Sequence, residues 1–301
     1  MKVNIVSWLK IARLQFYPMT FIAYGLGAAL SEDFRLNVFL LGYWILFLIE
    51  FATILVNEYY DYPSDKLNKY ASPFNGGTRV LVENRLKFSE VKTAIRILLG
   101  IIIVSGLFLV RLMPRPQILS VVFLIIAGLA LGLGYTAPPL KFSHRGWGEI
   151  VVGITHSLYV ILCGYVFQTG AWDDPLPWLL SIPLFFAVLG AISLSTIPDH
   201  EADMKAGKIT VSVKFGQRWA AVLSVGFIVA AAVSAIILIR YGYVSYPFLF
   251  LIIIHAGAIC LTIGRLIKSG DYDRRIDAIM MLALAFIIWF GLVPLVSTIH
   301  G

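Results

Sequence analysis

The chain has 301 residues, of which 59% are hydrophobic and only 14% are charged, with a formal net charge of +7. Ordinary soluble domains are roughly 25% charged, so this composition excludes a soluble globular enzyme and indicates a membrane protein. The positive charge fits contact with the anionic headgroups of membrane lipids, and no feature of the sequence calls for a nucleic-acid partner.

Nine apolar runs of roughly 20 residues follow one another along the chain, and this is the length that crosses a bilayer as a helix. We therefore expect an all-α, polytopic membrane protein with nine transmembrane helices around a central cavity, forming a single domain over residues 1–301. The first run resembles a signal peptide, but the eight runs after it favour a helix that is kept. The expected spans are 13–31, 36–57, 92–111, 117–135, 149–169, 177–198, 218–239, 246–266 and 277–298.

Basic residues are distributed unequally between the two sides that nine spans would create. Of the 24 lysines and arginines, all but Arg35, Arg111, Arg115 and Arg240 fall on the side of the N-terminus and of every second loop. Positively charged loops stay in the cytoplasm. We therefore expect a multi-pass protein of the cell membrane whose N-terminus is cytoplasmic and whose C-terminus is outside.

Two acidic clusters mark the ends of membrane spans on this cytoplasmic side, each with aspartates four residues apart. Residues at this spacing share one face of a helix. Their oxygens suit Mg²⁺, which proteins bind through a few carboxylates together with substrate phosphates. In a membrane protein, this combination indicates diphosphate chemistry at the mouth of a helical bundle. The expected Mg²⁺ ligands are Asn57, Asp61, Asp65, Asp199 and Asp203.

The same clusters suggest an internal repeat. They end the spans 36–57 and 177–198, which are four spans apart, and each is followed by a loop with glycine and basic residues. We expect two related units of four helices plus a ninth helix, with the units facing each other across the cavity. Because proline breaks the helical hydrogen-bond ladder, Pro63 predicts that the first acidic helix kinks or ends between Asp61 and Asp65.

Basic and interior polar residues complete the expected site. Arg79, Lys141 and Lys208 are placed to neutralise diphosphate oxygens, and an apolar cavity would accept a long hydrocarbon tail. The natural substrate is then a polyprenyl diphosphate, whose loss of diphosphate leaves an allylic cation that alkylates an electron-rich acceptor. The interior candidates for a general base are Glu50, Glu149 and His156, with the two on span 149–169 preferred.

Three longer motifs contain these residues: Asn57-x-x-x-Asp61-x-x-x-Asp65, then Tyr135-Thr-Ala-Pro-Pro-Leu-Lys141 leading to Arg145-Gly-Trp-Gly-Glu149, then Asp199-x-x-x-Asp203-x-x-x-Gly207-Lys208-x-Thr210. With them the sequence resembles the UbiA family of intramembrane prenyltransferases over essentially its whole length. The resemblance implies Mg²⁺-dependent transfer of an isoprenoid chain from its diphosphate to an acceptor that is often aromatic. It also implies that the aspartates hold Mg²⁺ against the diphosphate, with Tyr135, Lys141 and Lys208 in or near the site.

On this basis we assign two sets of site residues. The expected catalytic residues are Asp61, Asp199, Lys141 and Tyr135. The expected substrate-binding residues are Asn57, Arg79, Lys141, Arg145, Lys208 and Tyr135.

The acceptor is less constrained than the donor. The segment Ser72-Pro-Phe-Asn-Gly-Gly-Thr-Arg79 is similar to the dihydroxynaphthoate prenyltransferases of menaquinone synthesis, but those usually carry Asn or Asp where this chain has Ser195 and Thr196. The alternative acceptor is a glycerol phosphate lipid, with formation of an ether bond. A cation or proton transporter is the non-enzyme alternative. It is disfavoured because transporters carry such acids near the bilayer midplane, whereas these lie at span ends.

Overall fold

The structure, a computed structural model, describes residues 4–300, and every regular element in this range is helical. Eight helical segments are long and apolar enough to cross a membrane, which confirms the predicted all-α membrane architecture. The α-helices are α1 (Ile5–Ala12), α2 (Tyr17–Ala29), α3 (Leu36–Tyr60), α4 (Tyr62–Leu67), α5 (Phe88–Arg111), α6 (Ile118–Leu133), α7 (Gly148–Ile154), α8 (Val160–Thr169), α9 (Pro175–Lys205), α10 (Val211–Phe215), α11 (Gln217–Arg240), α12 (Phe248–Ser269) and α13 (Asp277–His300).

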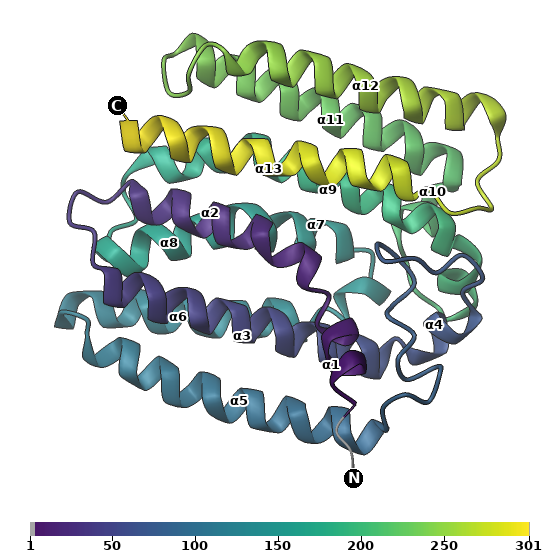
Figure 1. Ribbon diagram of the computed structural model, residues 1–301, viewed down its shortest axis with the longest axis horizontal. Coiled ribbons are helices and arrows are strands. Elements are labelled where there is room, and N and C mark those ends of the chain that lie inside the picture. Colours follow the sequence, from purple (N-terminus) through teal and green to yellow (C-terminus); the bar gives the residue numbers. More distant parts are fainter. Residues whose placement is uncertain (1–3, 301) are drawn as a thin grey trace.

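The first expected span is shorter than the others. Its helix α2 has 13 residues, fewer than the roughly 20 that cross a bilayer. It is separated from α1 by Arg13, whose φ of 51° is left-handed, and by a 3₁₀ turn at Leu14–Phe16. α2 packs against α8 and α13 and runs alongside the long helices (Figure 1). The count of nine spans therefore stays a prediction.

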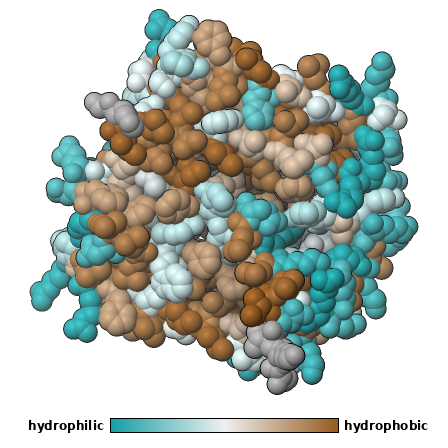
Figure 2. Space-filling view, viewed as in Figure 1, coloured by the Kyte–Doolittle hydropathy of each residue, from teal (hydrophilic) through white to brown (hydrophobic). Residues whose placement is uncertain are grey.

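The long helices run side by side, and their connections gather at the two ends of the bundle. Figure 1 places α4, α10 and the long loop 68–87 at one end, which we call the loop-rich end, and the C-terminus at the other. Figure 2 shows hydrophobic side chains over the middle of the molecule and hydrophilic ones over the loop-rich end. Leu119 and Ile254, which are 81% and 71% exposed, are among the large hydrophobic side chains on the surface of the protein, as expected for contact with lipid.

Proline acts differently in the two acidic helices. α3 ends and α4 begins around Asp61, with Pro63 in the first turn of α4, so the predicted helix end is confirmed. The backbone N–H of Asp65 still donates to the Asp61 carbonyl over 2.9 Å, which keeps the two aspartates one turn apart. α9 instead continues through Pro198 to the end of the second cluster.

The helix α9 is central to the bundle, because it packs against α7, α11 and α13. A π-helical turn, Thr155–Tyr159, joins α7 to α8 and also packs against α9. Such turns insert an extra residue into a helix and are frequent at functional sites. The arrangement brings α3, α9 and this π-helical turn around one interior space.

Candidate active site

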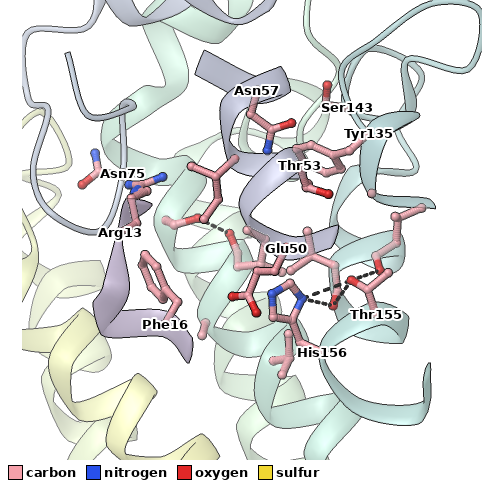
Figure 3. A pocket seen from close by; sticks show the side chains of 18 of the residues that line it. Arg13, Phe16, Glu50, Thr53, Asn57, Asn75, Tyr135, Ser143, Thr155 and His156 are labelled. Atoms are coloured by element: carbon pink, nitrogen blue, oxygen red, sulfur yellow. Dashed lines mark hydrogen bonds between the residues drawn. The ribbon is translucent and has the colours of Figure 1, made fainter. Parts of the chain in front are cut away.

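A cavity of about 330 Å³ lies between the helices, and its polar mouth faces the loop-rich end. Its inner wall is largely apolar, with Leu46 and Ile49 from α3, Val188 from α9 and Ile287 from α13. Figure 3 shows Asn57 and Tyr135 toward one end of this space and His156 toward the other. The predicted site residues that line it are Asn57, Asp61, Asp65, Tyr135, Asp199, Asp203 and Lys208.

The ammonium group of Lys208 joins the two acidic clusters at the mouth. It lies 3.0 Å from Asp61 Oδ2 and 3.4 Å from Asp203 Oδ1, and its side chain is only 11% exposed. Burial by itself would lower the pKa of Lys208, but the carboxylates of Asp61 and Asp203 outweigh that effect and raise it. The lysine is therefore charged and compensates the negative charge of both clusters.

One carboxylate oxygen at the mouth has no partner. Asp61 Oδ1 is buried, and no hydrogen bond reaches it from any residue within 4–300. Leaving such an oxygen unpaired is costly, so the position calls for a ligand that the chain itself does not supply.

The loop after α4 closes over the second cluster. Asp199 Oδ1 accepts hydrogen bonds from the side-chain amides of Asn68, over 2.6 Å, and Asn75, over 2.7 Å. The backbone N–H of Gly76 donates to Asp199 Oδ2 over 3.1 Å. Three hydrogen-bond donors of the loop thus converge on Asp199, one aspartate of the second cluster.

Asp65 is packed from two sides at the same mouth. It is 6% exposed, and the backbone of Gly77 (φ +67°) approaches its carboxylate so closely that a Cβ at this glycine would overlap it. Burial, followed by the nearby charges of Glu58 and Asp61, raises the pKa of Asp65. The neighbouring Ser64 donates to Asp203 Oδ1 over 2.9 Å, which connects α4 to α9.

Tyr135 and Asn57 form the wall opposite the loop. Burial and the nearby charge of Glu149 raise the pKa of the Tyr135 phenol, so it stays protonated. Asn57 Oδ1 accepts a hydrogen bond of 2.8 Å from the hydroxyl of Thr136. That bond orients the amide and joins α3 to the turn that follows α6.

Three predicted substrate-binding cations lie outside the cavity wall. The Arg79 guanidinium donates to the backbone carbonyls of Asp65 and Asn68 over 2.9 and 3.1 Å. Arg145 donates to the Pro139 carbonyl over 2.9 Å. Lys141 occupies the left-handed conformation (φ 46°) at a turn. Arg79 and Arg145 support loops around the mouth in this structure, and direct contact of any of the three with substrate stays a prediction.

Sequence reasoning missed several residues of the mouth. Arg13 lines the cavity although it stands outside the three motifs, and its guanidinium donates to the Pro73 carbonyl over 3.3 Å. Asn75, which also lines the cavity, belongs to the segment 72–79, but no role was predicted for its side chain. Glu58 accepts a hydrogen bond from the backbone of Thr78. The position of Glu58 beside Asn57 was the available signal for it, whereas no local pattern marks Arg13.

The three interior candidates for a general base have different contacts. Glu149 Oε1 accepts a hydrogen bond of 2.7 Å from the backbone N–H of Val211, the first residue of α10. This bond holds α7 to the start of α10 and leaves Glu149 a supporting residue. Glu50 and His156 instead line the cavity.

Three comparisons with known proteins agree with this architecture. The chain is 30% identical over 82% of its length to the 1,4-dihydroxy-2-naphthoate octaprenyltransferase of Bacillus subtilis (strain 168), of which the match covers 77%. It is 24% identical to the digeranylgeranylglyceryl phosphate synthase of Methanosphaera stadtmanae, with 82% and 83% of the two chains covered. A UbiA homologue from Archaeoglobus fulgidus, solved with DMAPP and Mg²⁺, shares the fold with a TM-score of 0.59 at 16% identity, covering 96% and 99% of the two chains.

The family assignment itself rests on the sequence profile of the UbiA prenyltransferase family, which matches residues 17–296. This range includes both acidic clusters, all of the cavity lining except Arg13 and Phe16, and the eight candidate membrane spans apart from residues 297–299 of the last one. The chain therefore belongs to the UbiA prenyltransferase family and is a membrane prenyltransferase.

Proposed function

We propose that this prenyltransferase transfers a polyprenyl group from its diphosphate to an aromatic acceptor such as dihydroxynaphthoate, with Mg²⁺ as the metal. The observation that carries the proposal is the meeting of Asp61, Asp203 and Lys208 at the mouth of a largely apolar cavity. The name of the Bacillus relative supports the aromatic acceptor. The DMAPP and Mg²⁺ in the Archaeoglobus structure support the donor and the metal.

The donor set at the mouth fits Mg²⁺. All the expected ligands, Asn57, Asp61, Asp65, Asp199 and Asp203, offer oxygen, and Asp61 Oδ1 is unpaired. Within residues 4–300, no three acidic, histidine or cysteine side chains lie close enough together to hold a metal ion by themselves. The proposal therefore requires the diphosphate to supply the remaining oxygens, as substrate phosphates commonly do for Mg²⁺. Bound there, Mg²⁺ would neutralise charge that develops on the leaving diphosphate.

Lys208 would bind the diphosphate next to the metal ligands. Its ammonium pairs with Asp61 and Asp203. When these carboxylates bind a cation instead, the lysine is free to turn its three donors to phosphate oxygens. Tyr135, held protonated, would donate its hydroxyl to the same group. These residues orient the bond that breaks and favour the departure of the diphosphate.

The remainder of the cavity would hold the prenyl chain and keep water out. Leu46, Ile49 and Val188 present apolar surface inside the cavity, and excluding water protects an allylic cation from hydrolysis. The loop that contacts Asp199 through Asn68 and Asn75 covers the mouth. It would complete the enclosure once the donor is bound.

A glycerol phosphate lipid is the second candidate acceptor. The Methanosphaera relative is named for such a reaction. The Arg13 guanidinium at the cavity wall is a cation that could pair with its phosphate.

The deciding experiment incubates purified protein and Mg²⁺ with a labelled polyprenyl diphosphate and a panel of acceptors. Transfer to a dihydroxy aromatic supports the first proposal, and transfer to the glycerol phosphate alone supports the second. Release of diphosphate without transfer to either class would contradict both acceptor assignments.

A further inference from the structure

Two proton-accepting side chains lie inside the cavity, away from the metal ligands. Glu50 stands seven residues before Asn57 on α3, so it lies about 10 Å further along the helix axis. His156 lies on the π-helical turn. Both line the same cavity as the acidic clusters, and Figure 3 shows the two side chains at the same level of it. They are placed where an acceptor, rather than the diphosphate, would lie.

The contacts of His156 leave one ring nitrogen basic. Its Nδ1 lies 3.1 Å from the Val152 carbonyl and 3.1 Å from the Thr155 hydroxyl, which itself donates to the Val151 carbonyl over 2.9 Å. Because both neighbours of Nδ1 then accept, we assign the hydrogen to Nδ1. The lone pair is then on Nε2, which no residue within 4–300 contacts by a hydrogen bond. Fixing one nitrogen through a backbone carbonyl is how proteins select the histidine tautomer. His156 thus presents a neutral, oriented base inside the cavity.

Glu50, like His156, has one polar atom engaged by a neighbour and one that is left for a ligand. The Thr20 hydroxyl lies 2.9 Å from Glu50 Oε2, while in the described part of the chain no hydrogen bond reaches Oε1. The hydroxyls of Thr53 and Ser195, which also line the cavity, donate to carbonyls of their own helices, Ile49 and Ile192. Among the described residues, Glu50 and His156 therefore offer acceptors of hydrogen bonds, whereas the cations Arg13 and Lys208 of the same cavity contact the loop and the acids of the mouth.

This pattern selects the chemistry of the ligand. A hydrocarbon chain against Glu50 and His156 would leave two polar groups without partners, which is costly inside a membrane protein. A phosphate presents mainly acceptor oxygens, which match neither Glu50 nor His156. A ring with two hydroxyl groups instead supplies one donor to Glu50 Oε1 and one to His156 Nε2.

We propose that Glu50 and His156 form the acceptor subsite for a dihydroxylated aromatic ring, with His156 as the general base; this rests on the proposed prenyl transfer. The C–O bond of the prenyl diphosphate breaks, and the diphosphate leaves with the electron pair. The ring carbon forms the new C–C bond while His156 Nε2 takes the proton of the conjugated hydroxyl, which gives a neutral ketone. Loss of the proton at the alkylated carbon and return of a proton to the oxygen restore the aromatic ring, with one proton released in total.

Equilibrium binding of dihydroxynaphthoate, measured without donor, tests the subsite directly. Glu50→Gln should weaken binding about tenfold, as expected for losing one hydrogen bond in a buried site. The matched control is His255→Gln. His255 is also a histidine of a membrane helix, but its nitrogens are engaged by Leu282 and Trp289, and this variant should bind normally. Unchanged binding in Glu50→Gln would overturn the subsite.

Kinetics test the role of His156. His156→Gln should lower kcat for transfer by about a hundredfold or more while the affinity for the prenyl diphosphate stays unchanged. The titratable groups that face His156 in the cavity are Glu50 from α3 and Tyr159, whose hydroxyl donates to the Leu124 carbonyl. The loss should shrink as pH approaches about 10, where a free phenol ionises unaided. An unchanged kcat, or a loss independent of pH, would overturn the general base.

The donor reaction is read separately in the same samples. Mg²⁺-dependent release of diphosphate by wild-type protein reports the proposed function and does not require the subsite. If wild-type protein releases diphosphate normally and Glu50→Gln still binds dihydroxynaphthoate normally, only this inference is contradicted. If wild-type protein releases no diphosphate but Glu50→Gln binds dihydroxynaphthoate more weakly, the proposed transfer is contradicted and the subsite is supported.

Discussion

Lys208 Nζ lies 3.0 Å from Asp61 Oδ2, and this contact joins the loop after α9 to the end of α3. A second contact, of 3.4 Å to Asp203, makes the lysine the link between the two halves of the mouth. With the lysine in this position, the charge that the acidic clusters need in the absence of metal comes from the chain itself. Metal and lysine therefore have overlapping electrostatic roles, and this overlap can be measured.

Lys208→Met should destabilise the protein and make it depend on metal. Removing one partner of a buried ion pair costs about 3–5 kcal/mol, and Asp61 and Asp203 would be left close together without a cation. Added Mg²⁺ should therefore raise the melting temperature of the variant more than that of wild type. The control is Lys205→Met, because Lys205 pairs with Glu201 at the surface and such pairs contribute about 1 kcal/mol or less. Equal Mg²⁺ responses in all three proteins would refute the overlap.

Asp61→Asn and Asp199→Asn should each abolish prenyl transfer while the protein still folds, and Asp61→Asn should be less destabilising than Lys208→Met because Lys208 keeps its pair with Asp203. Either change removes a charged oxygen from the proposed metal site, and neither creates a cavity in the helix packing. Wild-type activity should be lost in EDTA and return with Mg²⁺. The assay is product formation from labelled prenyl diphosphate, with circular dichroism as the check on folding. Full activity in either variant would exclude the two-cluster mechanism.

The sequence allowed much of this mouth to be predicted, because the signals are local. The four-residue spacing identified the aspartates, and Pro63 identified the end of α3. The pairing of Lys208 with Asp61 was not predictable, since it depends on how α9 packs opposite α3. The hydrogen-bond partners of Arg79 and Glu149 were not predictable either. Arg79 donates to backbone carbonyls, and Glu149 accepts from the backbone at the start of α10. Helical periodicity gives the face of a helix but not its partner in a distant loop.

The loop over Asp199 should become more protected when the donor binds. Residues 66–87 include Asn68, Asn75 and Gly76, which donate to Asp199. We expect hydrogen exchange across 66–87 to slow when Mg²⁺ and a non-hydrolysable prenyl diphosphate analogue bind, because the loop then closes the site against water. Exchange in α12, remote from the mouth, is the internal control. Unchanged loop exchange with tight binding confirmed would mean that this segment is not a lid.

Membrane orientation can be tested by cysteine labelling. Ser72 is a poor position for the probe, because it is 9% exposed and its hydroxyl bonds to Asn75. Lys69, whose side chain is 71% exposed, is better. With Cys163 and Cys260 replaced by alanine, a cysteine from Lys69→Cys should react with impermeant reagents only from the cytoplasm, and one from Asp173→Cys only from outside. Labelling of both from one face would contradict the expected topology.

The choice of acceptor separates the two candidate functions. We predict that dihydroxynaphthoate turns over faster than a glyceryl phosphate lipid with the same prenyl donor, because Glu50 and His156 line the cavity as acceptors for the two ring hydroxyl groups. Glu50→Gln removes one of these acceptors, so the variant should lose rate with the aromatic acceptor, and the difference in rate between the two acceptors should become smaller. Competition between the two acceptors in one reaction measures the ratio of their kcat/KM values directly. A preference of wild-type protein for the glycerol lipid would assign the chain to ether-bond formation and leave the metal and diphosphate proposals standing.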